Sequence, residues 1–227
     1  MLNIYYTVLL LSLSYSWGIS FIENTDIITI ATGGYHARSL VKSLRQKGHW
    51  RSSIYVISDD CTTPINHTFN VHVPRTSTPL ESKIHKMSIL NYTYSEYVLF
   101  LDSDIKIVNN LNYFFNQIPT WDPACQVYLG HDMWYSQKFT YNGGIILVKR
   151  HHSEHFLELW KNTILSNTYE GQKDQPGLKK IIDRQLVSVC PLPQETIQYL
   201  PDKSGHLRKP NVIFKHAMRL KKNKDKC

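Results

Sequence analysis

Two aspartates separated by one residue follow one of the most apolar short segments of the chain, residues 97–101. A run this short and apolar predicts a strand buried on both faces at the centre of a parallel sheet. Successive strand side chains point to opposite faces, so Asp102 and Asp104 should share one face, roughly 6.6 Å apart at about 3.3 Å per residue. Two such carboxylates raise each other's pKa, and a hard divalent cation (magnesium, calcium or manganese) would relieve their repulsion. We therefore predict a metal site beyond the carboxyl end of this strand; the alternative is a strand that leads into an acidic turn.

The segments around this strand alternate between strand and helix patterns. Residues 26–32 and 53–58 are apolar and β-branched, and residues 35–47 between them have helical spacing that ends at Gly48. A strand, a helix and a second strand in this order form a βαβ unit, which pairs its strands in parallel. Further elements are expected at residues 71–73, 80–92, 111–115, 126–129, 141–148, 152–165, 173–182 and 212–214. The sequence thus predicts one α/β domain over residues 21–227, with a mostly parallel central sheet flanked by helices.

The N-terminal segment and two glycosylation sequons predict entry into the secretory pathway. The first charged side chain is Glu23, and an apolar run over residues 4–13 is followed by small residues. This pattern is typical of a signal peptide over residues 1–20, although an uncleaved membrane anchor is the alternative, and only then would the protein contact a membrane. The sequons are Asn66-His67-Thr68 and Asn91-Tyr92-Thr93. We expect a protein of the endoplasmic reticulum or Golgi lumen, or a secreted one, with one disulfide among its four cysteines in an unassigned pairing.

Most of the net charge of +8 lies at the C-terminus, where residues 208–227 contain eight Lys or Arg and one Asp. Such a segment can bind nucleic acid, but a protein of the secretory lumen rarely meets one, so we expect no nucleic-acid partner. A diphosphate ligand and a merely solvated terminus are the remaining interpretations. The apolar residues 212–214 should anchor the segment on the sheet and bring His216 towards Asp102 and Asp104.

Taken together, these stretches resemble the GT-A fold nucleotide-sugar glycosyltransferases, and in particular the glycogenin-like retaining enzymes of glycosyltransferase family eight. The similarity covers residues 26–222 and implies a Rossmann-like nucleotide-diphospho-sugar transferase domain. The first strand and its turn, from Thr32 to Tyr35, resemble the segment of that family that binds uracil. Leu101-Asp102-Ser103-Asp104 resembles its Asp-x-Asp metal motif, and Asn142-Gly143-Gly144 resembles the strand that lines its sugar pocket.

The resemblance also assigns roles to residues in the second half of the chain. Asp174 and Gln175 resemble the pair beside the reacting sugar carbon, and His216 resembles the third metal ligand. Lys222 stands where the family often keeps a lysine for the diphosphate, and Asp132 is a candidate for binding donor or acceptor hydroxyls. Upstream, Lys86 has the spacing of a phosphate-binding lysine, with Lys83 as its rival. The chain departs from the pattern at Arg219, where the family usually has glycine.

The chemistry implied is transfer of a sugar from a nucleoside-diphosphate donor, such as a UDP-sugar, to a hydroxyl of a glycan, protein or small-molecule acceptor. Two carboxylates and an imidazole favour manganese as the cofactor, with magnesium possible. One alternative is a non-catalytic carbohydrate- or nucleotide-binding protein of the same fold. A secreted calcium-binding module is another, but it would need a denser set of oxygen ligands.

Overall fold

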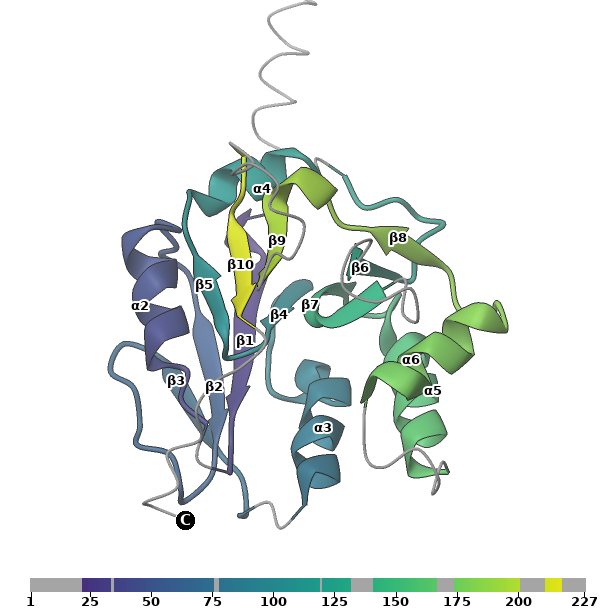
Figure 1. Cartoon of the computed structure of the whole chain (residues 1–227), viewed down its shortest axis with the longest axis horizontal. Coiled ribbons are helices and arrows are strands. Elements are labelled where there is room, and N and C mark those ends of the chain that lie inside the picture. The colour runs from purple at the N-terminus through teal and green to yellow at the C-terminus, as the bar shows by residue number, and fades with distance from the viewer. Residues whose placement is uncertain are drawn as a thin grey trace, which may run out of the picture.

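A computed structural model describes residues 22–33, 35–75, 78–118, 120–131, 141–166, 174–200 and 211–217. The expected signal peptide and most of the basic C-terminal segment lie outside these ranges. The described part is an α/β structure built on a seven-stranded sheet in the order β3-β2-β1-β4-β7-β6-β8 (Figure 1). The strands are β1 (Thr25–Ala31), β2 (Ile54–Ser58), β3 (Phe69–His72), β4 (Tyr97–Leu101), β6 (Val127–His131), β7 (Tyr141–Lys149) and β8 (Val189–Pro191).

Four of the six strand pairings in this sheet are parallel, which confirms the expected mostly parallel sheet. β1, β2 and β3 pair in parallel, and β4 pairs in parallel with β1, as the βαβ pattern predicts. β4 is the central strand of the seven, as predicted, but it is not flanked by parallel strands on both sides, because β7 runs antiparallel to both β4 and β6. The apolar run of β4 is explained equally well by burial on both faces, which holds for Val98 to Leu101.

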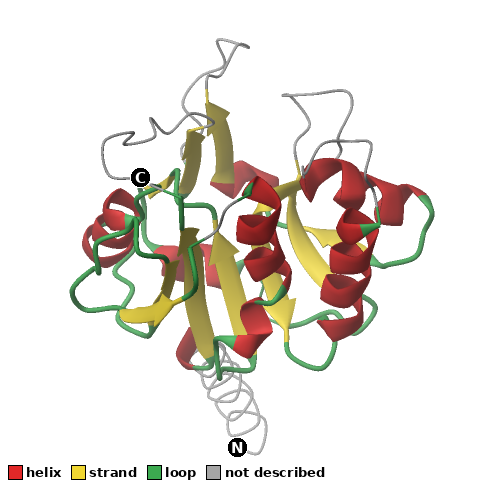
Figure 2. Ribbon diagram, turned by 90° about the horizontal axis from the view of Figure 1, so that it is seen from below, coloured by secondary structure: helices red, strands yellow, loops and turns green. Residues whose placement is uncertain are grey.

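Helices cover both faces of the large sheet (Figure 2). On one face, α2 (Arg38–Gln46) and α4 (Leu111–Asn116) share a core with Ile27, Leu99 and Leu147. On the other face, α3 (Pro79–Met87), α5 (Glu154–Leu165) and α6 (Asp174–Asp183) pack on Ile28, Phe100 and Ile146. Short 3₁₀ helices follow α3 and β8, at Ile89–Asn91 and Gln194–Thr196. The two cores fix the sheet, and with it the position of every strand end.

α2 begins three residues later than expected and does not end in a left-handed glycine. The positive φ falls on His49, whereas Gly48 is needed for a close approach: a Cβ there would lie 2.7 Å from the carbonyl oxygen of Leu44. Gly48 therefore ends the helix by letting the chain pass close to it, not by supplying the conformation that the sequence pattern implied.

A second, three-stranded sheet was not predicted from the sequence. It consists of β5 (Ile105–Ile107), β10 (Phe214–Ala217) and β9 (Ile197–Leu200), in that order. β10 pairs antiparallel with β5 and parallel with β9. Phe214 is fully buried and meets the ring of Phe114 edge-on, with centroids 5.0 Å apart. The apolar residues around Phe214 thus anchor the last described segment, as expected, beside the end of β4.

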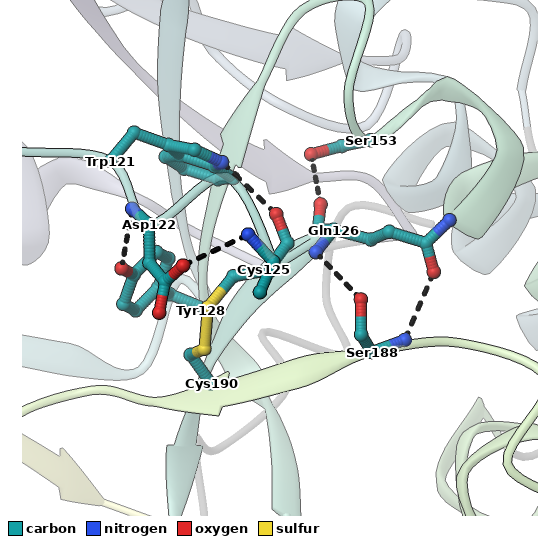
Figure 3. Close-up of a disulfide and its surroundings, with 9 residues drawn as sticks. Trp121, Asp122, Cys125, Gln126, Tyr128, Ser153, Ser188 and Cys190 are labelled. Carbon is teal, nitrogen blue, oxygen red and sulfur yellow. Dashed lines mark hydrogen bonds between the residues drawn. A yellow bond between two sulfur atoms is a disulfide. The ribbon is translucent and has the colours of Figure 1, made fainter.

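A disulfide joins Cys125, just before β6, to Cys190 in β8 (Figure 3). The indole nitrogen of Trp121 donates to the carbonyl oxygen of Cys125 at 3.0 Å, and Gln126 and Ser188 bond to each other beside the bridge. Cys61 is disulfide-bonded as well, so the expectation of a single disulfide is wrong. Its partner lies outside the described residues. Among the helices described, none combines the length and the apolar composition needed to cross a membrane.

Candidate metal centre

A tight turn presents the two aspartates of the Asp-x-Asp motif. β4 ends at Leu101, and residues 102–104 form a turn in which the amide of Ile105 donates to the carbonyl oxygen of Asp102 at 3.0 Å. The expectation that both aspartates continue the strand is therefore wrong. The turn nevertheless places their carboxylates beside each other, because both reach the same histidine. Ser103 lies between them and is half-buried.

His216 completes this group from β10, more than a hundred residues further along the chain. Its Nε2 lies 3.1 Å from Oδ1 of Asp104 and 3.8 Å from Oδ2 of Asp102. The ligand atoms of the three residues lie within 4.8 Å of one another. A cation bound at about 2.1 Å to octahedral ligands holds neighbouring ligand atoms about 3 Å apart and opposite ones about 4.2 Å apart. The group therefore has the size of a divalent metal site, with two carboxylate oxygens and one imidazole nitrogen.

Gly144 of β7 has no side chain and so leaves room for His216 and Asp102. Its carbonyl oxygen accepts from the amide of Asp102 at 2.8 Å, so its backbone lies directly against the turn. A Cβ at this position would be 2.5 Å from Cε1 of His216 and 2.9 Å from Oδ2 of Asp102. Any side chain here would displace a proposed ligand, which is a local reason for glycine at this point of the strand.

Lys86 of α3 lies next to the metal group and bridges two carboxylates. Its Nζ is 3.0 Å from Oδ1 of Asp102 and 2.8 Å from Oδ2 of Asp174, and it also donates to the carbonyl oxygen of Gly143 at 3.1 Å. The ammonium lies 4.9 Å from the centre of the Phe100 ring. Asp102 thus turns one oxygen to Lys86 and the other to His216. Lys83, one helical turn earlier, contacts the other oxygen of Asp174 at 3.4 Å.

These ion pairs shift the pKa values of their members in opposite directions. Burial alone would lower the pKa of Lys86, but the carboxylates of Asp102 and Asp174 outweigh it and hold that pKa above its ordinary value. Burial would raise the pKa of Asp174, but Lys86 and then Lys83 outweigh it and hold that pKa well below its usual range. At neutral pH, therefore, the lysine is a cation and Asp174 is a carboxylate.

Asp102 and His216, which lie 3.8 Å apart, both have pKa values above their ordinary ones. Burial raises the pKa of Asp102, although Lys86 and His216 act to lower it. For His216, burial acts to lower the pKa, but its hydrogen bond to Asp104 and the charge of Asp102 raise it. A cation bound between them would take the place of the imidazole proton, because a metal ligand must be a neutral imidazole.

α6 supplies the Asp-Gln pair and fixes it to β7. Gln175 accepts from the amide of Gly143 at 2.9 Å and donates to the carbonyl oxygen of Tyr141 at 2.9 Å. The indole of Trp160 on α5 donates to the backbone oxygen of Asp174 at 3.0 Å. Side chains at these positions therefore hold the start of α6 against the glycine strand. Pro176 suits the first helical turn because the backbone amides there have no acceptor within the helix, so its missing N–H costs nothing. A carboxylate such as that of Asp174 is favoured there by the helix dipole.

Asn142 turns back on its own strand. Its side-chain oxygen accepts from the amide of Gly144 at 2.7 Å, and it lies 2.9 Å from the place where a Gly144 Cβ would be. Asn142, Gly143 and Gly144, which were expected to line a sugar pocket, thus lie together beside Asp102. The predicted residues Asp132 and Lys222 lie outside the described residues.

Thr32 and Tyr35 follow the end of β1, the strand next to β4. Thr32 donates to the hydroxyl of Ser82 on α3 at 2.8 Å, and Tyr35 is 37% exposed. Asp59, which sequence reasoning did not select, organises this corner: its carboxylate accepts from the amides of Gly33 at 2.7 Å and Cys61 at 3.1 Å. Its position directly after β2 was the available signal, since carboxyl ends of parallel strands share one edge.

A second cluster of metal-ligand residue types does not form a metal site. Asp122 lies beside Cys125 and Cys190, but both sulfur atoms are used in the disulfide.

No protein-family model matches this chain, and no curated protein is significantly similar to it in sequence.

Proposed function

We propose that this protein is a metal-dependent glycosyltransferase of the GT-A type, which transfers a sugar from a nucleoside-diphosphate donor to an acceptor hydroxyl in the secretory pathway. The observation that carries the proposal is the convergence of Asp102, Asp104 and His216 at the carboxyl end of β4, directly beside the Lys86–Asp174 ion pair. A cation site and a buried lysine side by side suit a ligand that carries several negative charges, such as a diphosphate.

The mixed ligand set favours manganese, with magnesium as the alternative, because calcium prefers a larger set of oxygen ligands. A cation held by Asp102, Asp104 and His216 would stabilise the negative charge that develops on the departing diphosphate. Stabilisation of this kind is greater in the transition state than in the bound donor, and it therefore raises the rate of the chemical step.

In this reaction the bond between the anomeric carbon and the diphosphate oxygen breaks, and its electron pair leaves with the diphosphate. The acceptor oxygen forms the new bond to the anomeric carbon, and its proton passes to the released diphosphate. Lys86 would move part of its charge-assisted hydrogen bonding to the diphosphate oxygens. Asp174, held as a carboxylate, would stabilise positive charge on the sugar ring, and Gln175 keeps Asp174 in place through β7.

A non-catalytic binding protein of the same architecture is the second candidate. One observation favours it: both oxygens of Asp174 are already paired, with Lys86 at 2.8 Å and Lys83 at 3.4 Å. A carboxylate held this way binds and positions a ligand without needing to act on it. Both candidates would bind the nucleotide-sugar, but only the glycosyltransferase would turn it over.

A donor screen distinguishes them. The full chain, secreted from eukaryotic cells, is incubated with a panel of UDP- and GDP-sugars and manganese, and the released nucleoside diphosphate is measured. The glycosyltransferase proposal expects release with at least one donor, its loss with a chelator, and its return with manganese. Asp174→Asn should bind the nucleotide with similar affinity and lose at least a hundredfold in turnover. Binding without release from any donor would favour the non-catalytic candidate.

A further inference from the structure

Both predicted glycosylation sequons are followed immediately by an aromatic residue. Asn66-His67-Thr68 precedes Phe69, and Asn91-Tyr92-Thr93 precedes Tyr94. These two aromatic residues have the largest exposed fractions of all large hydrophobic side chains in the described part of the chain, 58% for Phe69 and 88% for Tyr94. Both asparagines are exposed too. The same arrangement thus occurs twice: a solvent-facing asparagine with an uncovered ring three residues later.

The exposure of Tyr94 is a fixed feature of the fold. The guanidinium of Arg150 donates to the carbonyl oxygens of Leu90 at 2.8 Å and Thr93 at 2.6 Å. The buried carboxylate of Asp26 accepts from the amide of Tyr94 at 3.1 Å. A backbone held from both sides still presents the ring of Tyr94 to solvent, so the ring is not exposed merely because its loop is loosely packed.

Phe69 is held equally firmly by its neighbour. It lies opposite Tyr55 in the β2–β3 ladder, and the two rings stack with centroids 5.0 Å apart. One face of Phe69 is therefore covered by Tyr55, while more than half of the side chain remains open. Phe69 begins β3 and Tyr94 precedes β4, so both lie towards the amino ends of the parallel strands. The candidate metal centre lies at the opposite, carboxyl end of β4.

We infer that Asn66 and Asn91 carry N-linked glycans whose first sugars cover Phe69 and Tyr94. An aromatic ring offers a flat apolar face, and a pyranose ring offers a matching face of C–H groups, so their contact removes apolar surface from water. A glycan attached three residues away is tethered next to the ring and loses little freedom on binding it. The amino-end location leaves the metal centre open. This inference does not rest on the proposed function, only on entry into the secretory pathway.

The attachment is the ordinary reaction of the sequon. The side-chain nitrogen of asparagine bonds to the anomeric carbon of an oligosaccharide carried on a lipid pyrophosphate, and the bond from that carbon to the pyrophosphate breaks. The lipid pyrophosphate leaves with the electron pair, and the asparagine nitrogen gives up one proton to the surrounding water. In the folded chain the hydroxyls of Thr68 and Thr93 donate to the carbonyl oxygens of Ile65 and Ile89 at 2.7 and 3.1 Å.

The first test is occupancy. The full chain is secreted from cultured animal cells, and its intact mass is measured before and after treatment with a peptide N-glycosidase. We expect two glycans, with Asn66→Gln and Asn91→Gln each removing one. The absence of either glycan from the secreted protein overturns the inference.

The second test asks whether the glycan lies on the ring. Thermal unfolding midpoints are measured for the secreted protein, Asn91→Gln, Tyr94→Ser and the double variant. Loss of the glycan should lower the midpoint by about 2–4 °C when Tyr94 is present and by less than 1 °C when it is serine. Tyr113→Ser, an exposed tyrosine without a sequon, is the matched control and should leave the effect of Asn91→Gln unchanged. An equal loss in the Tyr94 and Ser backgrounds would show that the glycan does not contact the ring.

Discussion

Lys86 and Asp174, which are 88 residues apart in the chain, form an ion pair at 2.8 Å between α3 and α6. Their side chains are only 7% and 16% exposed. The pair links the two helices that cover the same face of the sheet, and Lys86 extends it to Asp102 in the metal group. The charge of one lysine is therefore shared between two carboxylates, Asp102 and Asp174, at the point where the candidate ligand would bind.

Replacement of Lys86 should be far more costly than replacement of Lys83. Lys86→Met leaves Asp102 and Asp174 without their nearest cation, and losing one partner of a buried ion pair costs about 3–5 kcal/mol. Lys83 is 24% exposed and lies 3.4 Å from Asp174, so Lys83→Met should cost about 1 kcal/mol or less. Urea unfolding at pH 7 measures both. Equal losses would mean that Lys86 does not hold the two carboxylates together.

Asp174 should make stability depend on pH at the acidic end. Its folded pKa lies below the unfolded value of about 3.9, so its contribution is fully present above that value and is lost as pH falls through the folded pKa. The stability difference between the native sequence and Asp174→Asn should be constant from about pH 5 to 7 and shrink below about pH 4. Asp183, at the other end of α6, is 55% exposed, and the control Asp183→Asn should change the stability at pH 7 by about 1 kcal/mol or less. A stability difference that grows as the pH falls would contradict a lowered pKa for Asp174 in the folded protein.

Gly144→Ala should damage the metal site, whereas Gly143→Ala should not. The new methyl group at position 144 would lie 2.5 Å from the imidazole of His216 and would push a ligand away. At position 143 the methyl group would instead meet the Trp160 ring at 3.0 Å and Gln175 at 3.2 Å. In calorimetric titrations with manganese, Gly144→Ala should bind at least tenfold more weakly and Gly143→Ala within a few-fold of the native sequence. Similar affinities for all three proteins would argue against Gly144 as the floor of the site.

The Cys125–Cys190 disulfide should contribute to stability and not to metal binding. It closes a loop over a sequence separation of 65 residues, and bridges of this kind typically contribute about 2–4 kcal/mol. The double variant Cys125→Ala/Cys190→Ala should lose about that much in urea unfolding while keeping its manganese affinity, because neither cysteine contacts the metal group. An unchanged free energy of unfolding would show that the disulfide does not stabilise the fold.

Much of the large sheet could be predicted from local patterns. The apolar runs of β1, β2 and β4 and the helical spacing of α5 lie within a few residues of the observed elements. The direction of β7 could not be predicted, because a strand buried on both faces has the same sequence pattern in parallel and antiparallel pairings. The small sheet was missed for another reason: β5 has three residues and β9 and β10 have four each, too few for a periodic pattern.

The site was predicted in its parts better than in its geometry. Asp102, Asp104 and His216 lie together as expected, but a turn and not an extended strand brings the aspartates side by side. Lys83 and Lys86 could not be separated by spacing, since residues three apart share a helix face, and both indeed reach Asp174. The roles of Gly144 as a floor and Asp59 as a support depend on contacts between strands that no linear pattern contains.

The most direct test of the central claim is a manganese titration followed by electron paramagnetic resonance, with and without UDP. The native chain should bind one manganese ion, and UDP should tighten that binding because the two ligands would share the site. Asp104→Asn should bind manganese at least tenfold more weakly and lose the effect of UDP. Asp60→Asn, an exposed carboxylate just after β2, should behave like the native chain. Equal manganese affinity for Asp104→Asn and the native chain would contradict a metal centre at Asp102, Asp104 and His216.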